Sequence, residues 1–578
     1  MLFLFFKIDL KMYGDIIIYM RKDDYMKKAL SVILAAVIAL GAMLSLNVFA
    51  ESNVTYPAGI TEEMCNPSYW YDKGIGDGDK VLMTTDEIAA VNQAAIDGAG
   101  TNVIDLFNIK DTYDATKQKN SLAGTAIPTR DLYIDGQKIN NSEYFGKMIT
   151  AIKETGYEGT CQTQFAVCTT HADLKSFPTG DIIGYRAADP DDEYESSALC
   201  VNEPFAIRQK CEIDGKTFYW GYSLNCSGWV CADDFAICRD RSEWLEACRF
   251  DLDGDDFLVV TQDKIVTEPS LLAPYSSEVK LTFGTILRLV PEDEIPLLIG
   301  ERGAWNNYVV YLPTRDENGM YEAKPALISQ HCDVHIGFLP FTQANLLNVS
   351  FSCLGNRYGW AGMADSMDCS LYTRNIYRCF GLEIPRNTTW QQLVPNTAIS
   401  LAGLDDTQRE QLIETLHIGS LLYFSGHTMM YIGSENGTNY VISDLGTVID
   451  STGDLTVKTV YSVVVNPLTV RRGNGYTWLH NLTTVVTTVA PADLSDCTID
   501  AYRDENGEIQ VSVEYEGKPL YEGVNYTVER TDNTASVKGI NNFEGLVSVN
   551  VPQEKVGIFK KIANFFVNLF KKIASLFA

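Results

Sequence analysis

The sequence predicts a multidomain protein whose C-terminal half contains an α+β domain, with helices packed on an antiparallel sheet. Three observations support this prediction. The 578 residues exceed what one hydrophobic core accommodates, so roughly three to five domains are expected. Short apolar runs separated by turn residues fill residues 161–340, which is typical of small β-barrels. Between residues 341 and 490 helical patterns come before strand patterns, which favours helices segregated from the sheet.

Composition excludes one class of partner and leaves the chemistry open. The hydrophobic fraction of 46% is ordinary for folded protein, and the net charge of −29 argues against nucleic acid as a partner. Eight of the fourteen cysteines lie between Cys161 and Cys248, so in an exported protein this segment could hold disulfides of unknown connectivity. No cysteines show the spacing of a structural zinc site, and His331 and His335 have no evident third ligand. We therefore expect no metal and no cofactor.

The N-terminal segment predicts export. Basic residues end at Lys28, an uncharged apolar run covers Ala29–Leu46, and Val48-Phe49-Ala50 resembles a cleavage site with a small terminal residue. Residues 1–50 are therefore read as an upstream extension followed by a signal peptide. The alternative is an uncleaved membrane anchor, because the apolar run is almost long enough to span a bilayer.

The next elements follow from local patterns. Residues 58–160 are expected to be mainly helical, and Thr84 with Glu87 forms a capping box that opens a helix ending near Gly98. Two β-barrels are expected at 161–245 and 250–340. Their predicted strands include Gln164–Cys168, Phe205–Gln209, Thr217–Tyr222, Gly228–Cys231, Phe257–Thr261, Thr285–Val290 and Tyr308–Leu312.

The C-terminal elements follow in the same way. The α+β domain at 341–490 opens with helices at Thr342–Leu354 and Cys369–Phe380, and 491–552 is a small β module. Beyond it, Phe559-Lys-Lys-Ile-Ala563 recurs eleven residues later, which is about three helical turns, so both copies share one face. We expect 555–578 to be a cationic amphipathic helix that binds a membrane surface or an anionic wall polymer. Docking on the protein's own body is the alternative.

One cysteine has the setting of a thiol nucleophile. Cys369 lies between Asp368 and Ser370 at the start of a helical pattern, where the helix dipole lowers a thiol pKa. A base candidate, His427, lies in a turn between two apolar runs and so projects from the rim of a sheet. The residues alone leave two readings open, a Cys369–His427 dyad and a buried, inert cysteine.

These residues also carry a family resemblance. The stretch from Leu354 through Asp368-Cys369-Ser370 to Gly381-Leu-Glu-Ile-Pro-Arg386, with the His427 hairpin, resembles the NlpC/P60 family of cell-wall peptidases, which have a papain-like α+β catalytic domain. Residues 58–490 are similar to a subgroup with an N-terminal helical stabilising segment, two bacterial SH3-like barrels and the catalytic domain. The module at 491–552 resembles accessory β modules of exported proteins of Gram-positive bacteria.

The resemblance implies roles for particular residues. Cys369 would be the nucleophile and His427 the base, with Asp368 and Ser370 contacting the substrate and Tyr358 shaping the oxyanion region. The third polar residue, which orients the imidazole and is usually histidine, falls at Ser443. A serine accepts the ring N–H more weakly than an ionised or imidazole partner. Asp444 beside it is expected to contact substrate, or to orient His427 if a strand bulge turns it inward.

Two functions from different classes follow. The first is a secreted cysteine endopeptidase, in the cell wall or on the outer face of the cytoplasmic membrane of a Gram-positive bacterium, that hydrolyses the γ-D-glutamyl–diamino-acid bond of peptidoglycan stem peptides, as the resemblance implies. The second is a catalytically weak wall-binding or membrane-surface protein, which the serine at position 443 and the C-terminal helix favour. Related thiol chemistry, acyl transfer or amide hydrolysis, is a third possibility.

Overall fold

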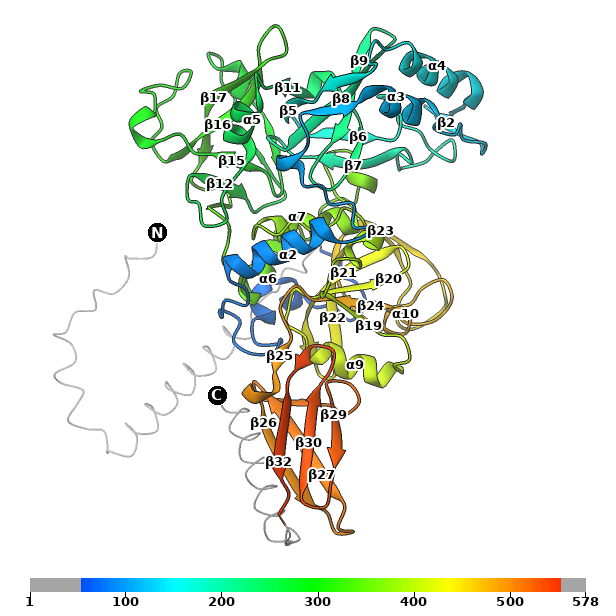
Figure 1. Cartoon of the computed structure of the whole chain (residues 1–578), viewed down its shortest axis with the longest axis vertical. Coiled ribbons are helices and arrows are strands. Elements are labelled where there is room, and N and C mark those ends of the chain that lie inside the picture. Colours follow the sequence, from blue (N-terminus) through cyan, green and yellow to red (C-terminus); the bar gives the residue numbers. More distant parts are fainter. Residues whose placement is uncertain (1–53, 553–578) are drawn as a thin grey trace, which may run out of the picture. The chain divides into compact units, whose positions relative to one another are not determined.

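The computed structural model describes residues 54–552, shown in colour in Figure 1. The predicted signal peptide and the predicted helix at 555–578 lie outside the described residues. Within the described range, no helix is both long and apolar enough to cross a bilayer. All elements discussed below belong to the compact unit that begins at Pro57.

The N-terminal helical region divides between two neighbours. The capping box predicted at Thr84 forms, and α2 (Thr85–Asp97) follows it. This first part packs on the α+β domain, where Trp70 is fully buried and the Asn92 amide donates to the Gly381 carbonyl at 2.8 Å. Two later helices instead bury Phe145 and its neighbours against the first β region. These helices are α3 (Ala115–Ala123) and α4 (Asn141–Lys153).

The first β region is one seven-stranded sheet with the order β11-β5-β8-β9-β10-β6-β7. Alternating apolar residues build its core, in which Phe205 and Phe235 are fully buried. The helix α5 (Arg241–Cys248) follows it. The strands are β5 (Gln164–Cys168), β6 (Ala172–Lys175), β7 (Glu195–Leu199), β8 (Pro204–Ile213), β9 (Lys216–Tyr222), β10 (Ser227–Cys231) and β11 (Phe235–Ile237).

The second β region is built from three small antiparallel sheets, β15-β12-β18, β13-β14 and β16-β17. A separate apolar core, which includes Leu258, Leu281 and Val310, lies among these strands. The strands are β12 (Phe257–Val260), β13 (Lys264–Val266), β14 (Lys280–Thr282), β15 (Ile286–Arg288), β16 (Asn307–Arg315), β17 (Tyr321–Ser329) and β18 (Val334–Ile336).

The α+β domain is a six-stranded antiparallel sheet, in the order β19-β24-β20-β21-β22-β23, with helices on both faces (Figure 1). The helix α7 packs on β21 and β22, and α9 joins the core on the other face. The helices are α6 (Gln343–Phe351), α7 (Cys369–Arg378), α8 (Thr388–Gln391), α9 (Asp406–Glu414) and α10 (Trp478–Asn481). The strands are β19 (Ala398–Ser400), β20 (Leu421–Phe424), β21 (His427–Glu435), β22 (Thr438–Val448), β23 (Lys458–Pro467) and β24 (Thr484–Val486).

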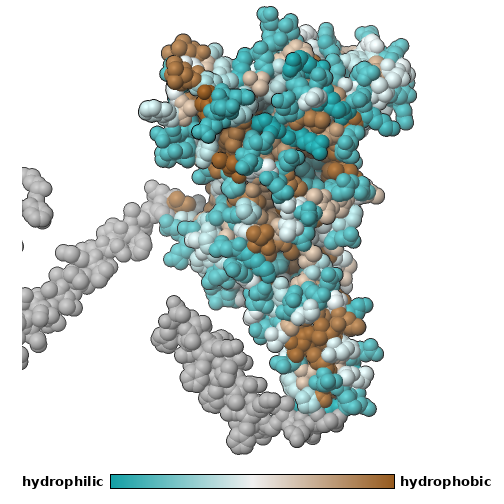
Figure 2. Space-filling model, turned by 60° about the vertical axis from the view of Figure 1, so that its left-hand side comes forward, coloured by the Kyte–Doolittle hydropathy of each residue, from teal (hydrophilic) through white to brown (hydrophobic). Residues whose placement is uncertain are grey.

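The C-terminal module has two three-stranded sheets around its own small core, which includes Val513, Val537 and Phe543. Most of the face in Figure 2 is hydrophilic, as expected for an acidic chain, and a brown apolar area lies over this module. The strands are β25 (Ala492–Asp493), β26 (Thr498–Arg503), β27 (Ile509–Tyr515), β28 (Lys518–Leu520), β29 (Tyr526–Arg530), β30 (Thr534–Gly539), β31 (Phe543–Glu544) and β32 (Leu546–Asn550).

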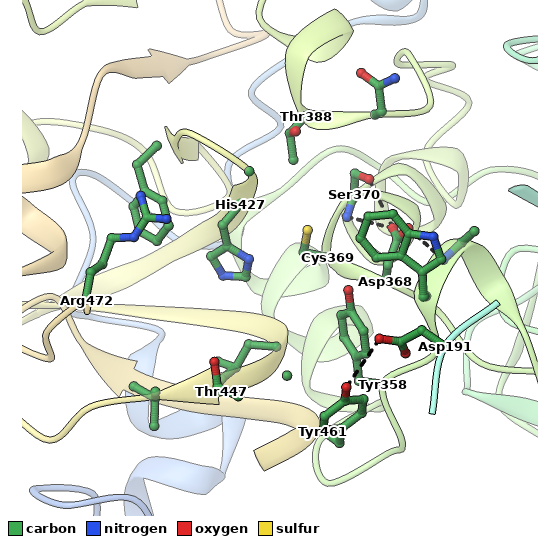
Figure 3. A pocket seen from close by; sticks show the side chains of 18 of the residues that line it. Asp191, Tyr358, Asp368, Cys369, Ser370, Thr388, His427, Thr447, Tyr461 and Arg472 are labelled. Carbon is green, nitrogen blue, oxygen red and sulfur yellow. Dashed lines mark hydrogen bonds between the residues drawn. The ribbon is translucent and has the colours of Figure 1, made fainter. Parts of the chain in front are cut away.

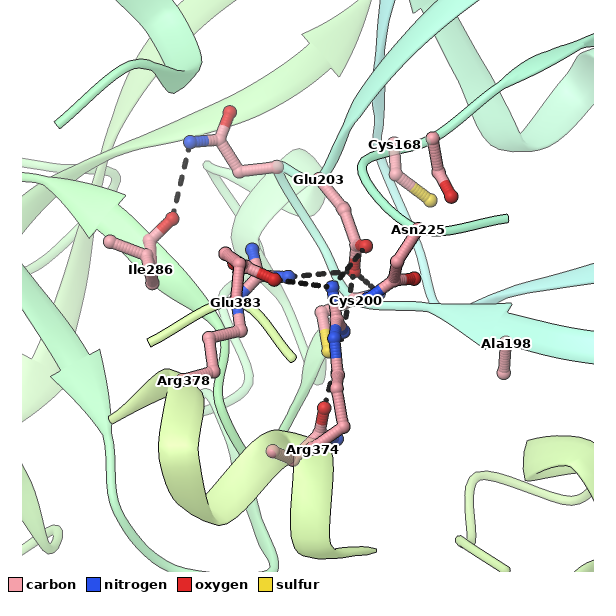
Figure 4. A network of polar contacts seen from close by, with 12 residues as sticks. Cys168, Ala198, Cys200, Glu203, Asn225, Ile286, Arg374, Arg378 and Glu383 are labelled. Atoms are coloured by element: carbon pink, nitrogen blue, oxygen red, sulfur yellow. Dashed lines mark hydrogen bonds and ion pairs between the residues drawn. The ribbon is translucent and has the colours of Figure 1, made fainter. Parts of the chain in front are cut away.

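A buried ion cluster joins the first β region to α7 (Figure 4). Glu203, which is fully buried, accepts from Arg374 at 2.8 Å and lies 3.1 Å from a guanidinium nitrogen of Arg378. Burial opposes the charge on Glu203, but the two arginines hold its pKa at about 2. Because buried charges persist only when paired, this cluster fixes α7 against the first β region.

Replacing Glu203 with glutamine removes the fully buried counter-charge that both arginines share and leaves them only the less buried Glu383, 3.3 Å from Arg374 and 3.8 Å from Arg378. We expect Glu203→Gln to lower the free energy of unfolding by roughly 3–5 kcal/mol, because breaking a buried ion pair strands its partners. The measurement is the denaturant midpoint at neutral pH. Since the pKa of Glu203 is lowered, the stabilisation is present above the ordinary glutamate pKa of 4.5 and is lost as the pH falls toward 2.

The matched control is Glu212→Gln near the far end of β8, the strand that begins directly after Glu203, where an exposed carboxylate lies 3.7 Å from Lys210. This change should shift stability by less than about 1 kcal/mol, as is usual for surface pairs. Equal losses for the two variants would mean that the cluster does not fix the helix.

Candidate active site

The nucleophile candidate lies at the first position of a buried helix. The carboxylate of Asp368, the residue before α7, accepts from the backbone N–H groups of Ser370 and Leu371 at 3.1 and 2.8 Å. Every residue of α7 is buried, and Cys369 itself is 8% exposed. Its sulfur points into a cavity of about 790 Å³ (Figure 3). The structure therefore places Cys369 at the helix start, as the sequence predicts.

Asp368 is held by an arginine that sequence reasoning gave no role. Arg386 donates to both carboxylate oxygens, at 3.2 and 3.0 Å, and to the Ser370 hydroxyl at 3.0 Å. Its Nε also donates to Ser197 of the first β region at 2.7 Å. Burial opposes the charge on Asp368, but Arg386 and the hydrogen bonds hold the pKa of this carboxyl below its usual range. Asp368 and Ser370 line the cavity while their polar atoms already have partners within the protein.

His427 lies at the rim of the sheet. It is the first residue of β21, after a two-residue turn with Gly426 at φ 83°. Its ring packs at 5.4 Å from the Phe424 ring and 5.2 Å from the Trp478 ring, centroid to centroid. Nε2 lies 3.3 Å from Oγ of Ser443, so Nδ1 is the nitrogen left for Cys369. Among residues 54–552, no hydrogen bond joins His427 to Cys369, although both line the cavity.

Ser443 and Asp444, which are adjacent on β22, point to opposite faces of the sheet. Ser443 shares its face with Val441 and Leu445, which pack in the core with α9. Side chains alternate along a strand, so Asp444 points to the α7 face, away from His427. Asp444 is fully buried, and neither of its oxygens has a hydrogen-bond partner in the described part of the chain.

This corrects the expectation for Asp444. The structure puts it neither in the cavity lining nor beside the imidazole, so it contacts neither a substrate there nor His427. Burial, with the charge of Asp368, raises its pKa to about 9, so the carboxyl is neutral at pH 7.

The pKa of the Cys369 thiol is raised, not lowered as its place at the start of a helix suggests. Burial, followed by the charge of Asp368, raises the pKa of Cys369 to about 12, although the N–H of Thr428 works in the opposite direction. Burial and the charge of Arg472 lower the pKa of His427 to about 3. The sequence led us to expect a lowered thiol pKa, because it reveals the helix start but not the desolvation. The resting pair is therefore a neutral thiol and a neutral imidazole.

The first β region supplies an acidic wall of the cavity, which sequence reasoning missed. Asp191, Glu195, Ser196 and Cys226 line it from that region. Asp191 accepts from the hydroxyl of Tyr461 at 3.3 Å. Burial raises the pKa of Glu195 to about 9, and its Oε1 has no partner among the described residues. No local signal marks these residues, because they reach the cavity only through domain packing.

Tyr358 and the remaining wall complete the cavity. The ring of Tyr358 meets that of Tyr461 edge-on at 5.6 Å, and its hydroxyl end points toward Cys369 in Figure 3. Burial raises the pKa of Tyr358, so this hydroxyl stays protonated. The other side of the cavity includes Arg471, Arg472 and Trp478.

Two further expectations concern cysteines and metals. All fourteen cysteines lie in residues 54–552 and none forms a disulfide, so the disulfides that the segment from Cys161 to Cys248 could hold are absent from this structure. Most of these thiols are buried in apolar cores, where they pack as small hydrophobic groups. No cluster of three metal-ligating side chains occurs in the described range, and His335 instead contacts the Gly337 carbonyl at 3.0 Å.

A cysteine at a buried helix start, with a histidine across one cavity, defines a site of the cysteine-peptidase class. The model of the NlpC/P60 family matches residues 355–466, so this segment is an NlpC/P60 domain, of a family of cysteine peptidases that act on peptidoglycan. The chain is thus a multidomain protein with this α+β domain in its C-terminal half, preceded by β-rich regions.

A solved structure supports the fold. An NlpC/P60 endopeptidase from Photobacterium damselae subsp. piscicida is 16% identical, with a TM-score of 0.54 over 76% of this chain and 99% of that chain. An NlpC/P60 family protein from Bacillus cereus ATCC 10987 is 17% identical, with a TM-score of 0.37 over 56% of this chain and 99% of that chain. No curated protein matches the sequence.

Because Cys369 and His427 are both neutral at rest, the thiol should react slowly at neutral pH. Alkylation of Cys369 by iodoacetamide should be slow at pH 7 and should rise about tenfold for each pH unit through pH 10, because only the thiolate reacts. Mass spectrometry of the peptide containing Cys369 gives the rate, with half-buried Cys161 as the internal reference. Fast, pH-independent alkylation between pH 5 and 8, lost in His427→Ala, would instead indicate a preformed thiolate–imidazolium pair.

The contact between His427 and Ser443 makes a second prediction. We expect Ser443→Ala to lower kcat by roughly threefold to tenfold with KM unchanged, because one neutral hydrogen bond of about 0.5–1.5 kcal/mol orients the ring. Steady-state kinetics on a cleavable peptide gives kcat and KM for the wild type and the variant. Ser462→Ala on β23, where the hydroxyl contacts only the Val463 carbonyl at 3.5 Å, is the control and should leave kcat unchanged. A change in KM alone would refute an orienting role.

Proposed function

We propose that this chain is an exported cysteine endopeptidase that hydrolyses the γ-D-glutamyl–diamino-acid bond of peptidoglycan stem peptides. One observation carries the proposal: Cys369 and His427 of an NlpC/P60 domain share a cavity with an acidic wall. The two β-rich regions are the SH3-like domains of this proposal. Export rests on the sequence of residues 1–50, and surface attachment rests on the predicted helix at 555–578.

The chemistry follows from the geometry of the pair. Cys369 Sγ attacks the amide carbonyl carbon while its proton passes to Nδ1 of His427, and the positive charge on the imidazolium is balanced by the negative charge that develops on the carbonyl oxygen. His427 then gives this proton to the leaving amine as the C–N bond breaks and a thioester remains. Water, deprotonated by His427, attacks the thioester, releases the acid and restores the thiol.

Two hydrogen-bond donors beside Cys369 are free to stabilise the oxyanion of the tetrahedral intermediate. Asp368 already accepts the N–H groups of Ser370 and Leu371, so those two groups are not free. The N–H of Cys369 at the start of α7 and the hydroxyl of Tyr358 are the donors that remain beside the thiol. Two such donors, fixed before the reaction, stabilise the charge that develops on the carbonyl oxygen.

The acidic wall supports selection for a free amino terminus. Asp191 and Glu195 lie in the cavity with no arginine or lysine within ion-pair distance among the described residues. An incoming ammonium group would supply the missing counter-charge and shift Glu195 toward its ionised form. A short stem peptide that begins with a free amine therefore fits this wall better than an acylated one.

Hydrolysis of defined peptides tests the proposal. Purified full chain should release L-Ala-D-Glu from L-Ala-γ-D-Glu-diamino-acid peptides, and Cys369→Ala and His427→Ala should each reduce the rate by at least about a thousandfold. Product masses give the readout. Cys332→Ala, at a half-buried position of the second β region, is the matched control and should retain activity. N-acetylation of the substrate should lower kcat/KM.

A second candidate is a catalytically weak wall-binding protein, which the neutral pair and the serine at position 443 favour. In that case the wild type and Cys369→Ala would both leave the peptides intact but would sediment equally with purified sacculi. Retained sedimentation without turnover would replace the peptidase proposal.

A further inference from the structure

Two adjacent arginines line the side of the cavity that lies opposite the acidic wall. Arg471 and Arg472 follow β23 and line the same cavity as Cys369 and His427. Figure 3 shows Arg472 beyond His427, with Asp191 on the far side of Cys369. The cavity is therefore acidic at one end and basic at the other, with the reactive pair between the two ends.

The arginines have no counter-charge in the described chain. Among residues 54–552, no carboxylate lies within ion-pair distance of Arg471 or Arg472, although the whole chain carries a net charge of −29. Arg472 is nevertheless held in place. Its guanidinium lies 4.3 Å from the Phe424 ring centroid and donates to the Ser425 carbonyl at 3.3 Å. A positioned guanidinium group, Arg472, beside the unpaired guanidinium of Arg471 in one cavity forms a site for an anion.

The reaction fixes which part of a substrate reaches them, and this step rests on the proposed function. His427 protonates the leaving amine, so the residue on the amine side of the broken bond must lie beside His427. Arg472 lies on that side and its charge already lowers the pKa of His427. The free amino terminus of the substrate lies at the other end, beside Asp191 and Glu195.

We propose that Arg471 and Arg472 form a subsite for a carboxylate on the side chain of the diamino acid that leaves. A guanidinium binds a carboxylate through two parallel hydrogen bonds, whereas it repels a lone ammonium group. The subsite therefore selects a diamino acid whose side chain ends in both an amine and a carboxylate over one that ends in an amine alone. Trp478 and Val457, which also line the cavity, provide apolar contact for the methylene chain.

Matched peptides test this subsite on the unaltered protein. The probes are L-Ala-γ-D-Glu-X with a C-terminal carboxamide, where X is 2,6-diaminopimelate, its side-chain amide or L-lysine. We expect kcat/KM for the diaminopimelate peptide to exceed both others by at least roughly tenfold, because only it presents a side-chain carboxylate. Replacing the C-terminal carboxamide of the lysine peptide with a free carboxylate should not raise its kcat/KM to that of the diaminopimelate peptide.

Substitution of the arginines tests the assignment. In the double variant Arg471→Gln, Arg472→Gln, the ratio of kcat/KM for the diaminopimelate and lysine peptides should fall to near one. Arg302→Gln, in the second β region and outside the cavity, should keep the wild-type ratio. A thermal unfolding curve checks that each variant is folded.

The outcomes separate this inference from the proposed function. Cleavage of all three peptides at equal rates, or a preference that survives in the double variant, would overturn the carboxylate subsite and leave the peptidase intact. If a free C-terminal carboxylate raised kcat/KM of the lysine peptide to that of the diaminopimelate peptide, the assignment to the side-chain carboxylate would also be overturned. Cleavage of none of the peptides would overturn the proposed function itself.

Discussion

The whole site depends on the burial of α7 between the sheet and the first β region. Each of its residues from Cys369 to Arg378 is buried, including two arginines. Buried charges along the helix are neutralised by partners elsewhere in the chain. Arg386 pairs with Asp368 at the helix start, and Glu203 pairs with Arg374 and Arg378. Since unpaired charges at such positions cost several kcal/mol, the helix is stable only where these partners meet it.

This constraint ties chemistry to domain packing. Glu203 and Ser197, which hold α7 and Arg386, belong to the same β region whose Asp191 and Glu195 form the cavity wall. The contacts that fix the nucleophile therefore also fix the wall that faces it. Burial has a second effect, since it favours the neutral forms of both Cys369 and His427. The pair separates charge only when a substrate carbonyl is present to accept the sulfur.

Local features of the site were predictable from the sequence. The capping pattern at Thr84, the helix start at Cys369 and the hairpin at His427 each depend on neighbours within a few residues, and each occurs in the structure. Period-two alternation along one strand separates Ser443 from Asp444, but only strand pairing shows that Ser443 is the one that reaches His427.

Features that depend on distant packing were not predictable. Arg386, Glu195 and Arg472 acquire their roles because separate regions of the chain converge on one cavity. The raised thiol pKa follows from desolvation, which overrides the helix start, and the cysteines of the first β region pack as thiols instead of pairing. A sequence motif reveals residue type and spacing, whereas burial and counter-charges emerge only from the fold.

The central claim is that Cys369 forms a thioester with the γ-carboxyl group of the D-glutamyl residue. It is tested most directly by mixing the protein with the γ-thiobenzyl ester of L-Ala-D-Glu, whose good leaving group makes deacylation the slow step, and quenching in acid. We expect the peptide containing Cys369 to gain the mass of L-Ala-D-Glu less one water. An adduct on a different residue, or turnover of the ester by Cys369→Ala at the wild-type rate, would contradict it.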